Sequence, residues 1–333
     1  MAIDIEKFFP AQAGVFAEFL AEVKGGKFAV VGHMRPDGDC ISSQLACANL
    51  LRLFGAAEVV CLNKHEVPYL YREFLNGEEF LNSEDFDRED FRIVTVDCAD
   101  YKRISEALQA KFPQIFAAFD HHVTAQSYAK YSIVESTAAA TAELLAGLML
   151  DAGIDFDANV ANVLFMGLMT DTRQLTTSNT NLRSFRISTA LVAKGARPAE
   201  VSVLLYQRER FARMKLLSVF LQSLTMHFGG RVCIGTLNAG VFDRTGAKKE
   251  DTDGLVDYAR NIDGVEIALL LEVLPDGGVK GSIRSKTPQA KVNEIAAVFG
   301  GGGHLAAAGF NVKMSLEDFY PKLLKIIGDR LGV

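Results

Sequence analysis

Through the first 195 residues, short apolar runs alternate with stretches in which apolar residues recur at helical spacing. Fully apolar runs of this kind are typical of strands that are buried on both faces of a sheet. The strand-like runs are KFAVVGH (27–33), AEVVCL (57–62), FRIVTVD (91–97) and QIFAAFD (114–120). The helix-like stretches are 12–23, 42–55, 101–111, 136–150, 157–169 and 181–195, and Ser136 or Thr137 is the expected cap of the fourth. This alternation predicts an α/β fold with a mostly parallel sheet sandwiched by helices.

The pattern changes at KGARPAEVS (194–202), where Gly195 and Pro198 interrupt the helical spacing. A long helical stretch is predicted from there to about residue 224. Strand-like runs follow at RVCIGTLN (231–238), VEIALLLEVL (265–274) and GGVKGSIRSK (277–286), and a helix is expected near 291–299. We therefore predict a first domain over 1–195, a helical connector over 196–225 and a second, smaller α/β domain over 226–333.

Side chains that bind metals stand where the elements of the first domain end. These residues are His33, Asp37 and Asp39 after the first strand, Asp97 at the end of the third, Asp120, His121 and His122 at the end of the fourth, and Asp171 near the end of a predicted helix. In an open parallel sheet, ligands bind beyond the carboxyl ends of the strands, so we expect these side chains to share one crevice. So many carboxylates would repel one another strongly unless cations lay among them.

The residue types indicate which cations these are. Imidazole and carboxylate ligands suit divalent ions, and manganese is favoured here over zinc or iron. The set exceeds what one ion needs, so we expect a pair of ions that share a carboxylate, as in enzymes that hydrolyse phosphoesters. Each motif alone has a structural interpretation, since Asp37 and Asp39 fit a turn and Asp97 fits a helix cap. Their common position at the ends of elements favours a metal centre. Cys40 and Cys98, beside these residues, are interpreted as packing.

A glycine-rich stretch stands out in the second domain. GGGGH (300–304) lets backbone N–H groups approach a phosphate closely, because glycine has no Cβ. A short helix is expected from Leu305, with its N-terminus toward the anion. Arg284 and His304 are candidate side-chain donors, and Lys286 is as readily a solvated lysine.

Composition and charge narrow the class of protein. The 333 residues are 49% hydrophobic and 23% charged, which is typical of a globular protein. The formal net charge of -6 argues against a long nucleic-acid duplex as a partner. Five cysteines without a CxxC pair fit a reducing cytoplasm. Neither a signal-peptide pattern nor an apolar run near the roughly 20 residues of a membrane span is found, so we expect a cytoplasmic protein without membrane association.

Together these motifs resemble the DHH phosphoesterases, named for the triplet that stands here at Asp120, His121 and His122. HxxPDGD, the aspartate at a strand end, DHH and TDT follow one another between residues 30 and 175. The stretches GSIRSK (281–286) and FGGGGHLAAAGF (299–310) resemble the DHH-associated domain. The length, without further nucleic-acid modules, is similar to the branch of bifunctional oligoribonucleases that also dephosphorylate 3'-phosphoadenosine 5'-phosphate.

The resemblance implies a role for each candidate residue. One metal would be held by His33, Asp37 and Asp97, and the other by Asp39, Asp97, His121 and Asp171. Asp120 would orient the histidines, His122 would face the scissile phosphate, and Arg284, Gly302, Gly303 and His304 would bind substrate. One departure is Arg173 where the family commonly has glycine after TDT, with Leu175 in place of the usual phenylalanine.

The expected activity is hydrolysis of short oligoribonucleotides and of 3'-phosphoadenosine 5'-phosphate to nucleoside monophosphates, with two divalent ions, manganese above all. The expected partners are these substrates, and a homodimer is the general expectation for a soluble enzyme. Two alternatives stay open. The chain could be a phosphodiesterase of cyclic or linear dinucleotides in signalling, or a non-catalytic regulator that binds nucleotides or RNA.

Overall fold

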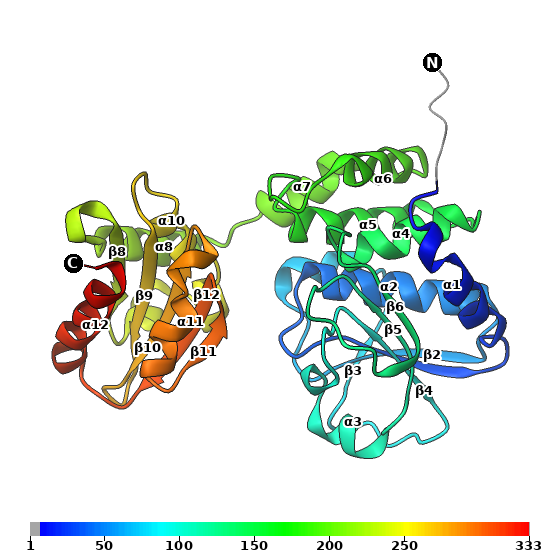
Figure 1. Ribbon diagram of the computed structural model, residues 1–333, viewed down its shortest axis with the longest axis horizontal. Helices are drawn as coiled ribbons and strands as arrows, with labels where there is room; N and C mark the ends of the chain where they lie inside the picture. Colours follow the sequence, from blue (N-terminus) through cyan, green and yellow to red (C-terminus); the bar gives the residue numbers. More distant parts are fainter. Residues whose placement is uncertain (1–6, 333) are drawn as a thin grey trace. The chain divides into compact units, whose positions relative to one another are not determined.

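The computed structural model describes residues 7–332, so the N-terminus on which the absence of a signal peptide was judged lies largely outside the described residues. The chain divides into two compact units, residues 1–208 and 209–333 (Figure 1). Each unit has its own sheet and its own apolar core. Among the described residues, no helix is both long enough and apolar enough to cross a bilayer.

The first unit is built on a six-stranded sheet in which every strand pair is parallel. Its strands are β1 (Lys27–Val31), β2 (Glu58–Asn63), β3 (Phe80–Asn82), β4 (Arg92–Val96), β5 (Ile115–Asp120) and β6 (Ala129–Val134). The strand order is β3-β2-β1-β4-β5-β6, so the order reverses between β1 and β4. At such a reversal the loops beyond the two strands diverge and leave a crevice. The predicted fold class is confirmed, and this crevice is where a site is expected.

Helices cover both faces of this sheet. They are α1 (Ala13–Ala21), α2 (Gly38–Leu53), α3 (Glu106–Lys111), α4 (Thr141–Asp151), α5 (Ala158–Asp171), α6 (Leu182–Ala193) and α7 (Pro198–Tyr206), with 3-10 turns at Pro10–Gln12, Tyr69–Phe74 and Tyr101–Arg103. The larger core unites α1, α2, α4 and α5 with one face of the sheet, and a smaller core packs α3 on the other. Figure 1 shows α6 and α7 stacked beyond α5.

Two helix starts differ from the prediction. Helix α2 begins at Gly38, inside the HxxPDGD motif and not at residue 42, with Asp37 as its N-cap. Helix α4 begins at Thr141, so neither Ser136 nor Thr137 caps it. The first free N–H groups of α4 are instead bound by Asp39, which is distant in sequence and which helical periodicity therefore does not reveal.

The second unit is a mixed sheet with helices on both faces. Its strands are β7 (Thr225–His227), β8 (Val232–Leu237), β9 (Ile267–Val273), β10 (Val279–Ser285), β11 (Gly302–His304) and β12 (Ala307–Val312), in the order β11-β12-β10-β9-β8-β7. Strands β8 and β9 are parallel, and the other pairs are antiparallel. The helices are α8 (Phe211–Gln222), α9 (Val241–Thr245), α10 (Leu255–Arg260), α11 (Val292–Val298) and α12 (Leu316–Leu331), with 3-10 turns at Phe228–Gly230, Lys249–Thr252 and Pro288–Ala290.

Two expectations for this half of the chain are wrong. The long helical stretch is interrupted at residues 207–210, where α7 ends and α8 has not begun. No helix starts at Leu305, because the glycines form an edge strand, β11, that turns back into β12. A Cβ on Gly301 or Gly303 would lie within 2.2 or 2.5 Å of a β12 carbonyl oxygen. These two glycines therefore let the edge strand approach β12, which explains them without a bound phosphate.

Candidate active site

The crevice at the strand-order reversal brings His33 and Asp97 together. His33 follows β1 and Asp97 follows β4, and the two strands are direct neighbours. Nε2 of His33 lies 3.4 Å from Oδ2 of Asp97 and 3.8 Å from Oδ1 of Asp37. Its other nitrogen, Nδ1, lies 2.9 Å from the Met34 carbonyl, which can only accept a hydrogen bond. The proton of neutral His33 is therefore held on Nδ1, and Nε2 faces the two carboxylates with its lone pair.

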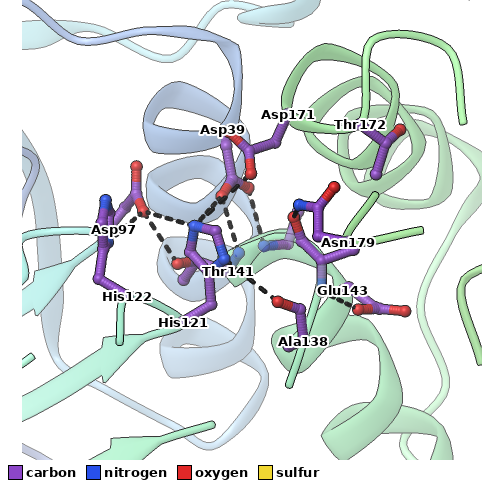
Figure 2. A network of polar contacts seen from close by, with 12 residues as sticks. Asp39, Asp97, His121, His122, Ala138, Thr141, Glu143, Asp171, Thr172 and Asn179 are labelled. Atoms are coloured by element: carbon purple, nitrogen blue, oxygen red, sulfur yellow. Dashed lines mark hydrogen bonds and ion pairs between the residues drawn. The ribbon is translucent and has the colours of Figure 1, made fainter. Parts of the chain in front are cut away.

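A second group forms around His121 on the other side of Asp97 (Figure 2). Nε2 of His121 lies 3.6 Å from Oδ1 of Asp97, 3.6 Å from Asp171 and 3.9 Å from Asp39. Asp97 thus turns one oxygen to His33 and the other to His121. The structure brings all six predicted ligands into two groups that share Asp97.

The backbone makes these approaches possible at two points. Asp97 has a φ of 58°, a left-handed conformation that aspartate tolerates better than most residues. A Cβ on Gly38 would lie 2.5 Å from the side chain of Thr170, so glycine lets the start of α2 approach the end of α5. That approach sets Asp39, in the first turn of α2, beside Asp171, the last residue of α5.

Asp120 and His122 form a hydrogen-bonded pair at the edge of the crevice. Oδ1 of Asp120 accepts hydrogen bonds from the backbone N–H and from Nδ1 of His122, at 2.7 and 2.8 Å. Its other oxygen accepts the N–H of Ala99, in the loop after Asp97. Nε2 of His122 points away from Asp120 and lies 3.4 Å from a guanidinium nitrogen of Arg103. Burial lowers the pKa of His122, but its hydrogen bond to Asp120 and the charge of Asp97 outweigh burial and raise it.

Two carboxylates of the crevice, Asp39 and Asp171, resist ionisation. Burial raises the pKa of Asp39 well above its ordinary value, and the neighbouring charges of Asp97 and Asp171 add to this. Burial also raises the pKa of Asp171, to about 6, against the opposing effect of His121. Negative charges are therefore concentrated here beyond what the surrounding protein groups neutralise.

This donor set fits divalent cations. Three groups of potential ligand atoms lie within 4.8 Å of one another among the described residues, and they are His33, Cys40 and Asp97; Asp97, His121 and His122; and Asp39, His121 and Asp171. Cations placed in them would offset the repulsion that raises the pKa values of Asp39 and Asp171. Cys40, which was interpreted as packing, is fully buried but has its thiol in the first of these groups. Burial raises the pKa of that thiol to about 11.

Sequence reasoning missed Arg103, the cation nearest to His122. Its carbonyl accepts the N–H of Met34, so it is tied to the turn that follows His33. The sequence did contain an indication of this role, because Arg103 is a basic residue in the loop that follows Asp97 at the end of a strand. Asp100, in the same loop, is no ligand candidate, because it accepts the N–H of Lys102 as the cap of a 3-10 turn.

Arg173, which stands where the family commonly has glycine after TDT, lies in a loop with an unusual backbone conformation. Arg173, Gln174 and Leu175 all have left-handed backbone conformations, with φ between 45° and 63°. Glycine adopts this conformation without steric cost, which accounts for the glycine that the family commonly has at this point. These three residues of the loop after Asp171 thus adopt a backbone conformation typical of glycine, although none of them is glycine.

In the second unit, two of the candidate substrate residues, Arg284 and His304, share one sheet row. Arg284 on β10 and His304 on β11 both pair with Ala307 on the intervening β12. Residues in one row of a sheet point to the same face, so the two side chains flank the small Ala307. The next row on this face is Ser282, Gly309 and Gly302, which adds only small residues. The face is open and has a basic residue and a histidine at its borders.

Arg284, in β10, and Lys286, just after its end, differ in their contacts. Lys286 donates a hydrogen bond to the carbonyl of Ile262, so it serves the fold of this unit. Arg284 donates to its neighbour's carbonyl, at Ile283, and no carboxylate pairs with it among the residues that the structure describes. Its charge is therefore available to an anion.

The crevice at the strand-order reversal thus gathers histidine and carboxylate groups that could hold divalent metal ions. The model of the DHH family, N-terminal domain, matches residues 27–168, and the model of the DHHA1 domain matches residues 229–332. The chain belongs to the DHH family and is a metal-dependent phosphoesterase, which sets aside a purely regulatory role. DHH-family enzymes bind divalent metals, and the groups around Asp97 fit them.

The chain is similar to known proteins over nearly its whole length. A "Bifunctional oligoribonuclease and PAP phosphatase NrnA" of Thermus thermophilus is 28% identical over 316 residues, which are 95% of this chain and 93% of the relative. An exopolyphosphatase-related protein from Bacteroides fragilis has the same fold, with a TM-score of 0.83 at 21% identity, covering 100% of this chain and 98% of that one. RecJ of Thermus thermophilus in complex with Mn2+ shares the fold with a TM-score of 0.51 at 15% identity, covering 96% of this chain and 54% of that one.

Proposed function

We propose that the protein uses two divalent ions, manganese above all, to hydrolyse short oligoribonucleotides and 3'-phosphoadenosine 5'-phosphate to nucleoside monophosphates. The observation that carries the proposal is Asp97, whose two oxygens face His33 at 3.4 Å and His121 at 3.6 Å. A carboxylate shared in this way suits a pair of ions, the usual arrangement for displacement at phosphorus. The likeness to the Thermus thermophilus relative supports the choice of substrates.

Each ion would have its own ligands beside the shared Asp97. His33 and Asp37 would hold one, and Asp39, His121 and Asp171 the other. When bound, the ions supply an activated water and stabilise charge on the phosphate oxygens. The protein's part is to keep both Nε2 atoms free of protons, which the carbonyls at Met34 and Ala138 do by accepting from Nδ1.

His122, Asp120 and Arg103 would act on the scissile phosphate. Asp120 holds the proton of His122 on Nδ1 and stabilises the doubly protonated ring, so that Nε2 can donate to a phosphate oxygen. Arg103 beside it offers a second cation and a planar donor fork. Together they would compensate the charge that develops on phosphorus-bound oxygens.

The open face around Ala307 would bind the rest of the nucleotide. Arg284 offers a bidentate contact to a phosphate, and His304 offers a ring that can stack on a base or donate to an oxygen. Gly302 leaves open space on this face, since a Cβ there would meet nothing within 4 Å. Gly303 allows the edge strand β11 to approach β12 closely. A few such contacts suffice for a short substrate, which fits an acidic protein.

The direct test is hydrolysis by the purified protein, with manganese, of 5'-labelled RNA of two to five nucleotides. 3'-phosphoadenosine 5'-phosphate and linear and cyclic dinucleotides are assayed in parallel. Fast hydrolysis of RNA and of the bisphosphate supports the proposal. Activity confined to dinucleotides would move the protein to the signalling alternative, and inactivity on all of these would refute the proposal.

The substrate face has its own test. Arg284→Ala is expected to raise KM about tenfold or more, through loss of a charge-assisted contact, with the bound metal unchanged. Lys280→Ala is the matched control, because it removes one cation from the same face of the same strand, farther along. An equal effect of both variants, or a loss of metal in Arg284→Ala, would contradict the assignment.

A further inference from the structure

One short segment, Ala138 to Ala142, contacts three of the candidate metal ligands (Figure 2). The carbonyl of Ala138 lies 3.2 Å from Nδ1 of His121. The N–H groups of Thr141 and Ala142 donate to the two oxygens of Asp39, at 2.7 and 2.8 Å. The hydroxyl of Thr141 lies 3.1 Å from Oδ1 of Asp97. We call these five residues the 138–142 segment.

These contacts fix the position of the ring proton of His121 and the orientation of the Asp39 carboxylate. A carbonyl can only accept, so Ala138 holds the proton of His121 on Nδ1 and turns the free lone pair of Nε2 to the carboxylates. The two N–H groups bind the Asp39 carboxylate through both oxygens and set its rotation. A displacement of the segment would therefore disturb His121 and Asp39 together.

In the first part of the segment, the N–H of Ala138 donates to the carbonyl of Glu135 and the carbonyl of Ala140 accepts from Leu144, but no backbone partner is found for Ala139 among the described residues. Residues 138–140 lie between β6 and α4, outside any helix or strand. The polar groups of Ala139 are bound by side chains instead. Its N–H donates to Oε2 of Glu143, and its carbonyl accepts from Nδ2 of Asn179 at 2.9 Å. Glu143 and Asn179 thus hold Ala139 from two directions.

Glu143 is an unusual residue for this position. Its side chain is 0% exposed, and a buried carboxylate is costly unless it is well paired. Its nearest cation is Arg183, with Nε 3.8 Å from Oε1, which is longer than a hydrogen bond. Oε1 has no hydrogen-bond partner among the described residues. An apolar side chain would be cheaper for the core, so a role beyond packing is indicated.

We propose that Glu143 and Asn179 are positioning residues that clamp Ala139, and thereby fix the 138–142 segment, the tautomer of His121 and the rotation of Asp39. The proposal rests on the proposed two-ion function. It assigns the clamp to the ion held by His121, Asp39 and Asp171, because the segment contacts His121, Asp39 and the Asp97 oxygen that faces His121, and among the described residues it makes no hydrogen bond to His33 or Asp37.

The test is a manganese titration of the full-length protein and its variants, followed by electron paramagnetic resonance, which counts free and bound ions. Glu143→Ala is expected to weaken one of two binding events about 10- to 100-fold, the range for partners that orient metal ligands. The other event is expected to change less than about threefold. Glu143→Gln keeps an acceptor for the Ala139 N–H and is expected to restore most of the affinity.

Two further variants separate positioning from general loss of stability. Leu144→Ala is the matched control, because Leu144 is the next residue of α4, fully buried, and outside the clamp. It is expected to lower the melting temperature and to leave both affinities unchanged. Asn179→Ala removes the other half of the clamp from an exposed residue, so the fold survives, and a drop of about tenfold at the same single site is expected.

A direct readout is the tautomer of His121 in the metal-free protein labelled with ¹⁵N-histidine. The wild type is expected to carry the neutral-ring proton on Nδ1, and Glu143→Ala is expected to show a mixture of tautomers. Equal weakening of both ions, the same weakening in Leu144→Ala, or an unchanged tautomer would each overturn the proposal. A wild-type protein that binds no second ion would instead refute the proposed function.

Discussion

Asp97→Asn is the substitution that separates catalysis from folding most clearly. The side chain keeps its size, and asparagine tolerates the left-handed φ of 58° at this position as aspartate does. What changes is the shared negative charge between His33, 3.4 Å away, and His121, 3.6 Å away. One of the two oxygens also becomes an NH₂ group, which cannot bind a cation.

The expected loss of metal affinity in Asp97→Asn follows from the lost charge alone. Two unit charges about 4 Å apart interact by roughly 4 kcal/mol at an effective dielectric constant of about 20. Even if desolvation cancels about half of this, the loss is about 2 kcal/mol for each ion, or roughly 30-fold in affinity. Because the site needs both ions, we expect hydrolysis to fall at least about 100-fold at limiting manganese.

The stability of the metal-free Asp97→Asn variant is not expected to fall with its activity. The charge of Asp97 is one of the causes that raise the pKa of Asp39, after burial, so the two carboxylates repel each other in the metal-free protein. Removing that charge relieves the repulsion, and the melting temperature of metal-free Asp97→Asn is expected to equal or exceed that of the wild type. The combination of lost activity and retained stability cannot arise from unfolding.

The assay measures hydrolysis of 5'-labelled dinucleotide to pentanucleotide RNA, bound manganese and thermal unfolding in the same preparations. Asp100→Asn is the matched control, because Asp100 lies in the same loop but only caps a 3-10 turn, which asparagine does equally well. Activity of Asp97→Asn within tenfold of the wild type would refute the sharing of Asp97. Loss of one ion with the other bound at normal affinity would refute it as well.

Three further outcomes are expected. Gln174→Gly relieves a left-handed residue with an exposed side chain, and chemical denaturation should show a gain of about 0.5–1 kcal/mol. The pKa of Asp171 is raised from 3.8 to about 6, so the metal-free protein should lose stability as pH rises through this window. The increase in melting temperature that manganese causes should grow over the same window, because ligands bind deprotonated. Cys40→Ala should lower zinc affinity about tenfold and leave manganese affinity nearly unchanged, since thiolates prefer softer ions. If the variant binds zinc as tightly as the wild type does, Cys40 serves packing and not metal binding.

The gathering of the candidate metal ligands in one crevice was predictable because its signals are local. Each ligand follows a short apolar strand or ends a helix, and parallel strands bring their carboxyl ends to one edge. His33 and Asp97 needed only that β1 and β4 be neighbours, and the apolar runs already suggested a buried parallel sheet. The sharing of Asp97 came from the family resemblance and from the count of ligands, and the distances on its two oxygens are consistent with it.

What escaped prediction depends on contacts between distant residues. Glu143 reads as an ordinary polar position of a helix, and only the fold places it under the Ala139 backbone. The four glycines suggested a phosphate loop, because the sequence does not say that Gly301 and Gly303 lie against β12. Arg103 was overlooked because basic residues in loops are common and only the neighbouring His122 gives it meaning.

The same kind of long-range contact makes Asp39 different from Asp97 as a candidate metal ligand. Asp39 is 1% exposed, and its oxygens bind the N–H groups that open α4, so it caps a helix as well as facing His121. Loss of a cap costs about 1 kcal/mol, and two buried N–H groups left unsatisfied cost more. Asp39→Ala is therefore expected to lower the free energy of unfolding and the activity together, where Asp97→Asn lowers activity alone. Urea unfolding of the two metal-free variants decides this, since equal stability would mean that Asp39 serves the metal and not the helix.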